Sequence, residues 1–136
     1  MSSKKLMPAL MLLTVLMFGC KKYEEGPGLS FRSKEARVAN TWKVAKCTVG
    51  NTDYTSYYTN LDYSETYEEN GNYSYKSNSG SGAGKWEFQQ DKEQIKRSGV
   101  SGQPTRELVI LRLKDKEFWY YFMDNGSRYE FHMEEK

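Results

Sequence analysis

The chain has 136 residues, one domain's length, with frequent Tyr (11 residues) and many Gly, Asn and Ser breaks, a composition typical of β structure. Its 20 basic residues slightly exceed its 18 acidic ones, and the excess is supplied by Lys4 and Lys5 in the N-terminal segment. The rest of the chain is electrically balanced, so charge gives no case for a nucleic-acid-binding protein.

An apolar run from Leu6 to Phe18 follows the two lysines and ends at Gly19 and Cys20. A membrane-spanning helix needs about 20 apolar residues, so this run is too short to span comfortably. A positive start, a short apolar stretch and a small residue at its end are typical of a secretory signal peptide. We therefore predict an exported protein that is cut before Cys20.

The segment LMFGC, residues 16–20, resembles the lipobox of bacterial lipoproteins. This resemblance implies that residues 1–19 are a lipoprotein signal peptide and that Cys20 carries diacylglycerol on its thiol and a further acyl chain, such as palmitate, on its amino group. Two or three chains anchor a protein stably, because each buried CH₂ contributes roughly 0.8 kcal/mol. The alternative is an ordinary signal peptide with a chance cysteine at its end. We expect a lipid-anchored protein of the cell envelope, with the membrane face left open.

The residues after Cys20 have the composition of a flexible stem. Residues 21–32, KKYEEGPGLSFR, are charged and contain Gly26, Pro27 and Gly28. A charged stretch in this place also resembles the surface-export signals of Bacteroidetes-type lipoproteins. We assign residues 20–32 to the lipidated cysteine and its tether, and residues 33–136 to the folded domain.

Short strands separated by turn signals fill the domain. One short helix is expected at residues 33–39, with Ser33 as its cap. We expect a polar, Tyr-rich loop at residues 54–62 and a Gly/Ser loop at residues 77–84. The expected strands, in chain order, are residues 42–49, 63–68, 72–77, 85–89, 94–98, 106–113, 117–123 and 127–133.

Alternation within these strands predicts which side chains share a face. Trp42 and Val44 should lie on one face of the first strand, with Ala45, Cys47 and Val49 on the other. Strand 94–98 is mostly polar and suits an edge or a solvent-facing position. Residues 108–111 are apolar on both faces, as in a strand covered on both sides.

Tight turns join most of these strands, and the Asn-Gly pairs at residues 70–71 and 125–126 are typical of hairpins. Sequential hairpins give an up-and-down meander, and eight strands can close into a barrel that removes the exposed edges. We therefore predict an all-β protein with an eight-stranded antiparallel up-and-down barrel and a short N-terminal helix. Such a barrel is filled by side chains or holds one small ligand.

Four stretches are similar to the lipocalin-like domains of Bacteroidetes-type lipoproteins. They are RVANTWKVAKCTVGNTDYT, TYEENGNYSY, GKWEFQQDKEQI and LVILRLKDKEFWYYF. In this resemblance Trp42 takes the place of the tryptophan on the first lipocalin strand, and Asn40 stands where lipocalins have glycine. The resemblance extends over most of the domain. It implies a lipocalin-like barrel that binds a small molecule, although its marks concern packing and turns more than chemistry.

The residues give little support for catalysis. His132 is the single histidine, and the alternation of the last strand places it opposite Phe131 and Met133, as expected for a solvated strand histidine. Cys47 is the one cysteine after the anchor, and a small buried residue is the simplest interpretation. Neighbouring pairs such as Glu68 and Glu69 point to opposite faces of a strand. We expect no enzyme, no metal site and no cofactor.

Two groups of aromatic residues suggest two functions. One group either fills the barrel or lines a cavity for a small apolar or amphipathic ligand: Trp42, Trp86, Phe88, Trp119, Tyr129 and Phe131. The other lies in or near the polar loop and either covers a barrel end or contacts an envelope protein or glycan: Tyr54, Tyr57, Tyr58 and Tyr63. A ligand-binding module is the first hypothesis and an interaction module the second.

Overall fold

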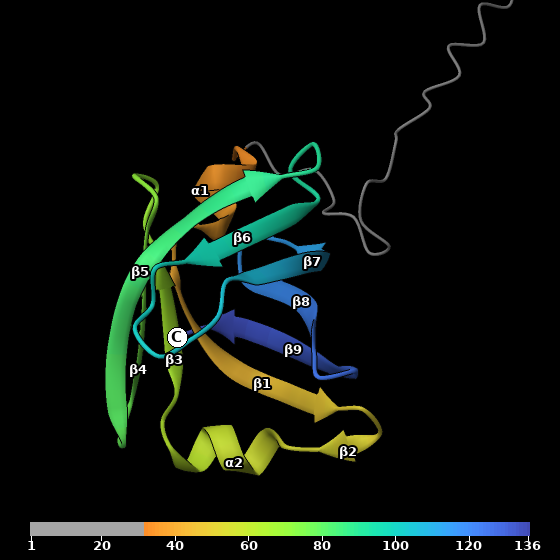
Figure 1. Cartoon of the computed structure of the whole chain (residues 1–136). Coiled ribbons are helices and arrows are strands. Elements are labelled where there is room, and N and C mark those ends of the chain that lie inside the picture. The colour runs from red at the N-terminus through yellow and green to blue at the C-terminus, as the bar shows by residue number, and fades with distance from the viewer. Residues whose placement is uncertain (1–31) are drawn as a thin grey trace, which may run out of the picture.

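The computed structural model describes residues 32–136, in which one antiparallel sheet closes into a barrel (Figure 1). The strands follow the order β2-β1-β3-β4-β5-β6-β7-β8-β9, and β1 also pairs with β9. That pairing joins the first long strand to the last and leaves the barrel without an open edge. The predicted eight-stranded up-and-down barrel is confirmed, with β2 as an additional short strand beside β1.

The helices and strands are short and follow one another closely. Their bounds are α1 Lys34–Val38, β1 Thr41–Val49, β2 Thr52–Asp53, α2 Thr55–Asn60, β3 Ser64–Tyr67, β4 Asn72–Ser77, β5 Gly80–Gln89, β6 Gln94–Ser98, β7 Arg106–Leu113, β8 Glu117–Asp124 and β9 Ser127–Glu135. The predicted signal peptide and Cys20 lie outside the described residues, as does the predicted tether apart from Arg32. Because the barrel formed by the described strands is closed by the β1–β9 pairing, we expect residues 32–136 to fold by themselves.

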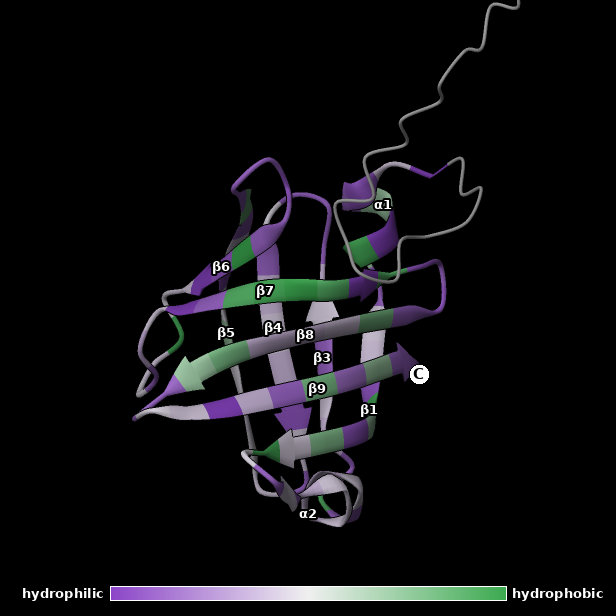
Figure 2. Ribbon diagram, turned by 90° about the vertical axis from the view of Figure 1, so that its right-hand side faces the viewer, coloured by the Kyte–Doolittle hydropathy of each residue, from purple (hydrophilic) through white to green (hydrophobic). Residues whose placement is uncertain are grey.

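The two helices lie at opposite ends of the barrel (Figure 2). At one end the Oγ atom of Ser33 accepts a hydrogen bond from the Ala36 amide at the start of α1, at 3.1 Å, which confirms the predicted cap. The indole of Trp42 donates to the carbonyl of Val38 at 2.9 Å, and the guanidinium of Arg37 donates to the carbonyl of Leu113 at 3.1 Å. These bonds hold α1 against the end of the barrel.

The predicted faces of β1 are wrong after Val44, because the strand contains a β-bulge. The register of β1 against β9 shifts between Val44 and Lys46, so Ala45 is an extra residue without a partner. Trp42, Val44 and Cys47 are consequently all buried, whereas strict alternation placed Cys47 opposite the other two. Ala45 is exposed. The bulge reverses the alternation halfway along the strand.

Both predicted loops are partly wrong. Residues 54–62 contain α2, whose first amide, that of Thr55, donates to the Asp53 carboxylate at 2.8 Å, while the Thr55 hydroxyl accepts from the Cys47 amide. Residues 77–84 are not a loop, because β5 begins at Gly80 and pairs with β4 from Ser77 onward. In both cases contacts with a neighbouring strand, β1 for α2 and β4 for the start of β5, supply the order that local composition lacks.

The interpretation of strand 94–98 as an edge or solvent-facing strand is wrong. β6 lies between β5 and β7, and its side chains at Ile95 and Arg97 point into the barrel, where both are buried. In β7, Leu108 and Ile110 are buried while Val109 and Leu111 are half-buried, so only one face is fully covered. A second bulge at Leu111 turns the following strand end inward, and Figure 2 shows the apolar stretch along β7.

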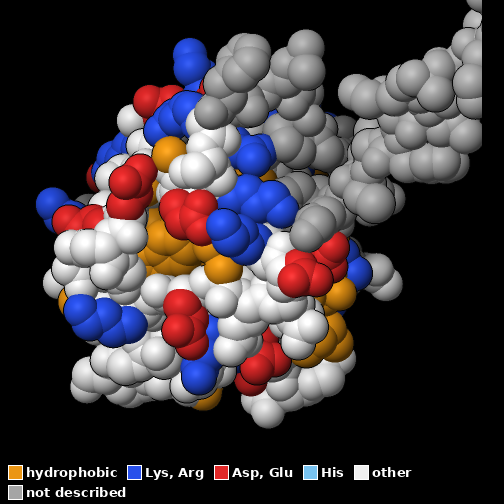
Figure 3. Space-filling model, turned by 90° about the horizontal axis from the view of Figure 1, so that it is seen from above, with side chains coloured by type: hydrophobic (Ala, Val, Ile, Leu, Met, Phe, Trp, Pro, Cys, Tyr) orange, Lys and Arg blue, Asp and Glu red, His pale blue; other side chains and the backbone are white. Residues whose placement is uncertain are grey.

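The core fills the interior of the barrel and extends to the cavity wall, where Phe122 and Phe131 belong to both. Its members are aromatic, aliphatic and sulfur-containing side chains from all eight barrel strands, among them Trp42, Tyr67, Trp86, Leu108, Phe118, Tyr120 and Met133. Seen from the α1 end, acidic and basic side chains alternate around an apolar patch (Figure 3). Charges of both signs are therefore mixed on this face, in keeping with the even charge balance of the chain.

Candidate functional site

A cavity of about 390 Å³ opens at the α2 end of the barrel. Helix α2, the loop between β6 and β7, and the ends of β4, β7, β8 and β9 surround it. Its walls are rich in aromatic side chains, namely Tyr57, Tyr58, Tyr63, Tyr75, Phe122, Tyr129 and Phe131. This volume is within the range of about 300–1,000 Å³ that is usual for small-molecule sites.

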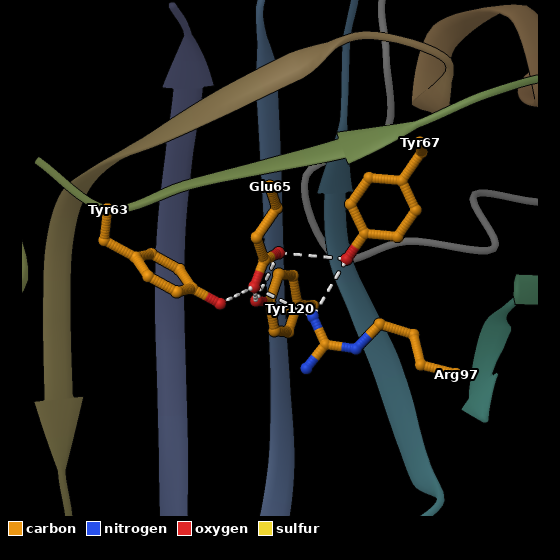
Figure 4. Close-up of polar contacts among 5 residues, drawn as sticks. All are labelled: Tyr63, Glu65, Tyr67, Arg97 and Tyr120. Atoms are coloured by element: carbon orange, nitrogen blue, oxygen red, sulfur yellow. Dashed lines mark hydrogen bonds and ion pairs between the residues drawn. The ribbon is translucent and has the colours of Figure 1, made fainter. Parts of the chain in front are cut away.

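A buried carboxylate lies at the floor of this cavity (Figure 4). Glu65, on β3, is 1% exposed and accepts hydrogen bonds from three tyrosine hydroxyls, Tyr63 at 2.6 Å, Tyr67 at 2.9 Å and Tyr120 at 2.8 Å. The guanidinium of Arg97, on β6, forms an ion pair with the same carboxylate at 2.8 Å. Residues from β6 and β8 thus meet one side chain of β3 in the middle of the barrel.

Local strand geometry explains how the carboxylate reaches this position. Tyr63, directly before β3, alternates with Glu65 and Tyr67 within it, so the three side chains leave the same face of the extended chain and enter the barrel together. Their two hydroxyls approach the carboxylate from either side, as Figure 4 shows. Tyr120 reaches it from the opposite wall, on β8.

Arg97 is held by rings as well as by charge. Its guanidinium carbon lies 4.7 Å from the ring centre of Tyr73 and 5.7 Å from that of Tyr120, both within cation–π range. Its Nη1 group donates to Glu65 and also to the Tyr67 hydroxyl at 3.1 Å. The charge is therefore buried with a counterion, a hydroxyl and two aromatic faces around it.

The pKa values of the surrounding tyrosines reflect this arrangement. Burial, followed by the nearby negative charge of Glu65, raises the pKa of Tyr63 and of Tyr120 well above its ordinary value. Burial also raises the pKa of Tyr67, and Arg97 opposes that shift. Burial alone would lower the pKa of Arg97, but the interactions with Tyr67 and Glu65 outweigh it and raise the pKa. The hydroxyls thus remain protonated donors and the guanidinium remains charged.

A second ion pair lies at the mouth of the cavity. Arg106, at the start of β7, and Asp124, at the end of β8, approach to 3.5 Å. The guanidinium carbon of Arg106 also lies 4.6 Å from the ring centre of Phe122. All four residues with a charged side chain in the cavity wall, Glu65, Arg97, Arg106 and Asp124, therefore form two pairs of opposite charge.

The four tyrosines of the predicted interaction loop form a chain of edge-to-face rings. Tyr54 contacts Tyr57, Tyr57 contacts Tyr58, and Tyr58 contacts both Tyr63 and Phe131, with ring centres between 5.1 and 6.5 Å apart. Tyr54 is 42% and Tyr57 58% exposed, whereas Tyr58 and Tyr63 are half-buried. The series therefore leads from the surface of α2 into the cavity.

The six residues predicted to line a cavity occupy three different environments. Tyr129 and Phe131, on β9, line the cavity at the α2 end. Trp42 and Trp86 are buried in the core, where the Trp86 indole donates to the carbonyl of Glu68 and Phe88 packs against its ring. Trp119 lies on the outer face of β8, stacked on His132 with ring centres 3.9 Å apart. The structure therefore brings only two of the six residues to this cavity.

Sequence reasoning missed Glu65 and Arg97, the two residues at the centre of the cavity floor. The alternation Tyr63-Ser64-Glu65-Thr66-Tyr67 was a usable signal, because it places a carboxylate on the same face as two aromatic rings. Arg97 likewise shares a face with Ile95. Two opposite charges on inward faces of different strands predict a buried pair once the barrel is accepted.

The other titratable side chains weighed for catalysis, His132 and Cys47, are engaged in contacts that stabilise the fold. His132 contacts the Glu130 carboxylate at 2.8 Å on the outer face, and Cys47 is buried, which raises the pKa of its thiol to about 12. Within residues 32–136, no group of three or more His, Cys, Asp or Glu side chains is placed to hold a metal ion. No helix in that same part is long and apolar enough to cross a bilayer.

No protein-family model matches the chain, and no curated protein matches it.

Proposed function

We propose that the protein is a lipid-anchored envelope lipoprotein whose lipocalin-like barrel binds one small amphipathic molecule in the cavity at the α2 end. The observation behind this proposal is the combination of aromatic walls with a polar floor in a space of about 390 Å³. Binding sites for small molecules are concave and mostly apolar, with a few well-placed polar groups. The role proposed is binding without catalysis.

The geometry favours a ligand that is polar at one end. The rings of Tyr58, Tyr129 and Phe131 offer apolar area along the wall, and the Glu65–Arg97 network offers hydrogen bonds at the floor. An entirely apolar ligand would cover these polar groups without replacing their water, which costs free energy. A molecule with a polar head and an apolar body meets both surfaces.

The proposal is tested by native mass spectrometry of residues 21–136 purified from the protein's own envelope. A retained molecule of defined mass is expected. Gln103→Trp, in the loop at the mouth, should reduce its occupancy, because the larger side chain narrows the entrance. Lys116→Trp places the same ring at the opposite end, in the exposed turn between β7 and β8, and should leave occupancy unchanged. Equal loss in both variants, or no retained mass and no binding by added amphiphiles, would contradict the proposal.

The second candidate is an interaction module acting through two exposed rings, Tyr54 at the cap of α2 and Tyr57 within it. Tyr54 and Tyr57 are the exposed large aromatic residues of the described chain, and they lie side by side. Exposed tyrosines supply rigid contact area with a hydrogen-bonding tip, which suits an envelope protein or glycan. Replacing Tyr54, which does not line the cavity, by serine should weaken such a contact while leaving ligand retention in the cavity intact.

A further inference from the structure

We propose that the cavity selects an uncharged ligand whose polar head both accepts and donates hydrogen bonds, such as a hydroxyl or an amide, and excludes carboxylates and ammonium groups. This inference rests on the proposed function, because it concerns the molecule that the same cavity would hold. It follows from the charge balance of the cavity wall and from the hydrogen-bonding capacity left at its floor.

The charged side chains of the cavity wall balance one another. The cavity wall contains two acidic and two basic side chains, and each is paired with an opposite charge, Glu65 with Arg97 at 2.8 Å and Arg106 with Asp124 at 3.5 Å. A charged ligand would lose its water on entering without gaining a net counter-charge. Burying an ion without a partner is far more costly than burying a hydrogen-bonded neutral group. An uncharged head avoids this cost.

The carboxylate of Glu65 is not available to a ligand. It already accepts from Tyr63, Tyr67, Tyr120 and Arg97, four donors that match the roughly four lone-pair positions of a carboxylate. An ammonium head would have to displace Arg97 or a hydroxyl from it. The negative charge at the floor is therefore saturated.

Some hydrogen-bonding capacity remains at the floor of the cavity. The hydrogen bonds of Arg97 to Glu65 and Tyr67 both leave from Nη1, and among residues 32–136 no group accepts a hydrogen bond from its Nη2. The hydroxyls of Tyr63 and Tyr120 donate to Glu65 and so retain lone pairs. A ligand hydroxyl at the floor can accept from the guanidinium and donate to a tyrosine oxygen.

The apolar body of the ligand then points outward. Tyr57 in the cavity wall is 58% exposed, Phe122 contacts Arg106 of the ion pair at the mouth, and Tyr129 stacks on Phe122, whereas Glu65 is 1% exposed. The head enters first and the body rests between these rings. This orientation places the uncharged polar group where the water-excluded hydrogen bonds are strongest.

The test compares three probes with the same chain and different heads: dodecanol, dodecanoate and dodecylammonium. Their binding to residues 21–136 is measured by competition for a neutral fluorescent amphiphile. Dodecanol should bind roughly tenfold or more tightly than either ion, because the ions enter without a counter-charge. Tighter binding of dodecanoate or of dodecylammonium, or equal binding of all three, would overturn the inference while leaving a ligand-binding barrel in place. Binding of none of the three would remove the proposed function and the inference together.

A variant at the mouth checks that charge balance is the cause without disturbing the buried floor. Asp124→Asn leaves the partly exposed Arg106 without its carboxylate partner and adds one net positive charge to the cavity. The preference for dodecanol over dodecanoate should fall by roughly threefold or more. Glu130→Gln makes the same change of charge on the outer face of β9, where its partners are Arg128 and His132, and should leave the preference as it was. An equal effect of both variants would show that overall charge, not the cavity, sets the preference.

Discussion

Glu65, at the floor of the cavity, is the single residue on which most of the buried hydrogen bonds there depend. Glu65 is the acceptor for three hydroxyls and one guanidinium, so its removal leaves several buried donors without a partner. Breaking a buried ion pair from one side is strongly destabilising, whereas replacing both partners by apolar residues is often nearly neutral. The cost of removing one partner is therefore larger than the net contribution of the pair to stability.

We expect Glu65→Leu to lower the free energy of unfolding by about 3–5 kcal/mol, because Arg97 stays buried without a counterion. Adding Arg97→Met should restore part of this loss by removing the uncompensated charge, although three hydroxyls still lack their acceptor. Urea unfolding of both variants measures the difference. Glu130→Gln, in a partly exposed pair, should cost at most about 1 kcal/mol. A double variant less stable than Glu65→Leu would contradict this account of the pair.

Buried tyrosines predict how stability depends on alkaline pH. Burial raises the pKa of Tyr63, Tyr67 and Tyr120, so above pH about 10 the unfolded chain binds fewer protons than the folded chain. Their contribution to stability is present in full below that pH and is lost as the pH rises beyond it. Phenolate absorbance followed together with circular dichroism should show a group of tyrosines that ionise only as the barrel unfolds. Ionisation of every tyrosine in one phase, with the fold intact, would be the contrary result.

At the scale of elements, two bulges and a glycine-rich strand shape the barrel. The bulges at Ala45 and Leu111 reverse the alternation within β1 and β7 and so return later side chains to the interior. Glycines in the first half of β5 allow neighbouring groups to approach its backbone closely. A Cβ atom at Gly82 would lie 2.5 Å from the Tyr75 ring, and one at Gly84 would lie 2.4 Å from the carbonyl oxygen of Ser98.

Gly84→Ala should destabilise the barrel by about 1–3 kcal/mol, because the clash is with backbone that cannot move without breaking the strand pairing. Ser81→Ala, on an exposed position of the same strand, is the matched control and should be nearly neutral. Urea denaturation of the two variants gives the comparison. Equal stabilities would mean that β5 can shift away from Ser98 at no cost.

The whole molecule has two unlike ends. The described chain begins beside α1, at the end of the barrel opposite α2 (Figure 1). Trp42 of the core bonds to α1, whereas the cavity opens beside α2. In the proposed lipoprotein the tether therefore joins the end remote from the mouth, and ligand exchange does not require the anchored end to open. This arrangement is compatible with exchange of a ligand while the protein stays bound to a membrane.

Cys20→Ala should release the full chain from membranes, because the proposed acyl chains would have no attachment point. Fractionation followed by a carbonate wash measures the bound share. Cys47→Ala is the matched control, since it removes the buried core thiol and leaves the proposed anchor unchanged. A Cys20→Ala protein that remains fully membrane-bound after the wash would contradict the lipid anchor.

The sequence by itself determined most of the elements. Alternating β-branched and aromatic residues predicted eight strands, seven of them close to their observed bounds and β5 without its first five residues, and Asn-Gly pairs predicted two of the hairpins. These features follow from local backbone preferences and from the period of two along a strand, which a single segment displays without its neighbours. The barrel followed from them because consecutive hairpins leave edges that closure removes.

Tertiary structure alone decided the rest. The helix at residues 55–60 packs on β1 and, through Tyr58, on Phe131 of β9, and the start of β5 is ordered by pairing with β4; a bulge also changes which residues face inward without a clear local mark. The same holds for the cavity floor. Glu65 and Arg97 each share a strand face with aromatic or apolar neighbours, but neither strand shows its partner, and they become a buried pair because closure of the barrel brings β3 and β6 face to face across its interior.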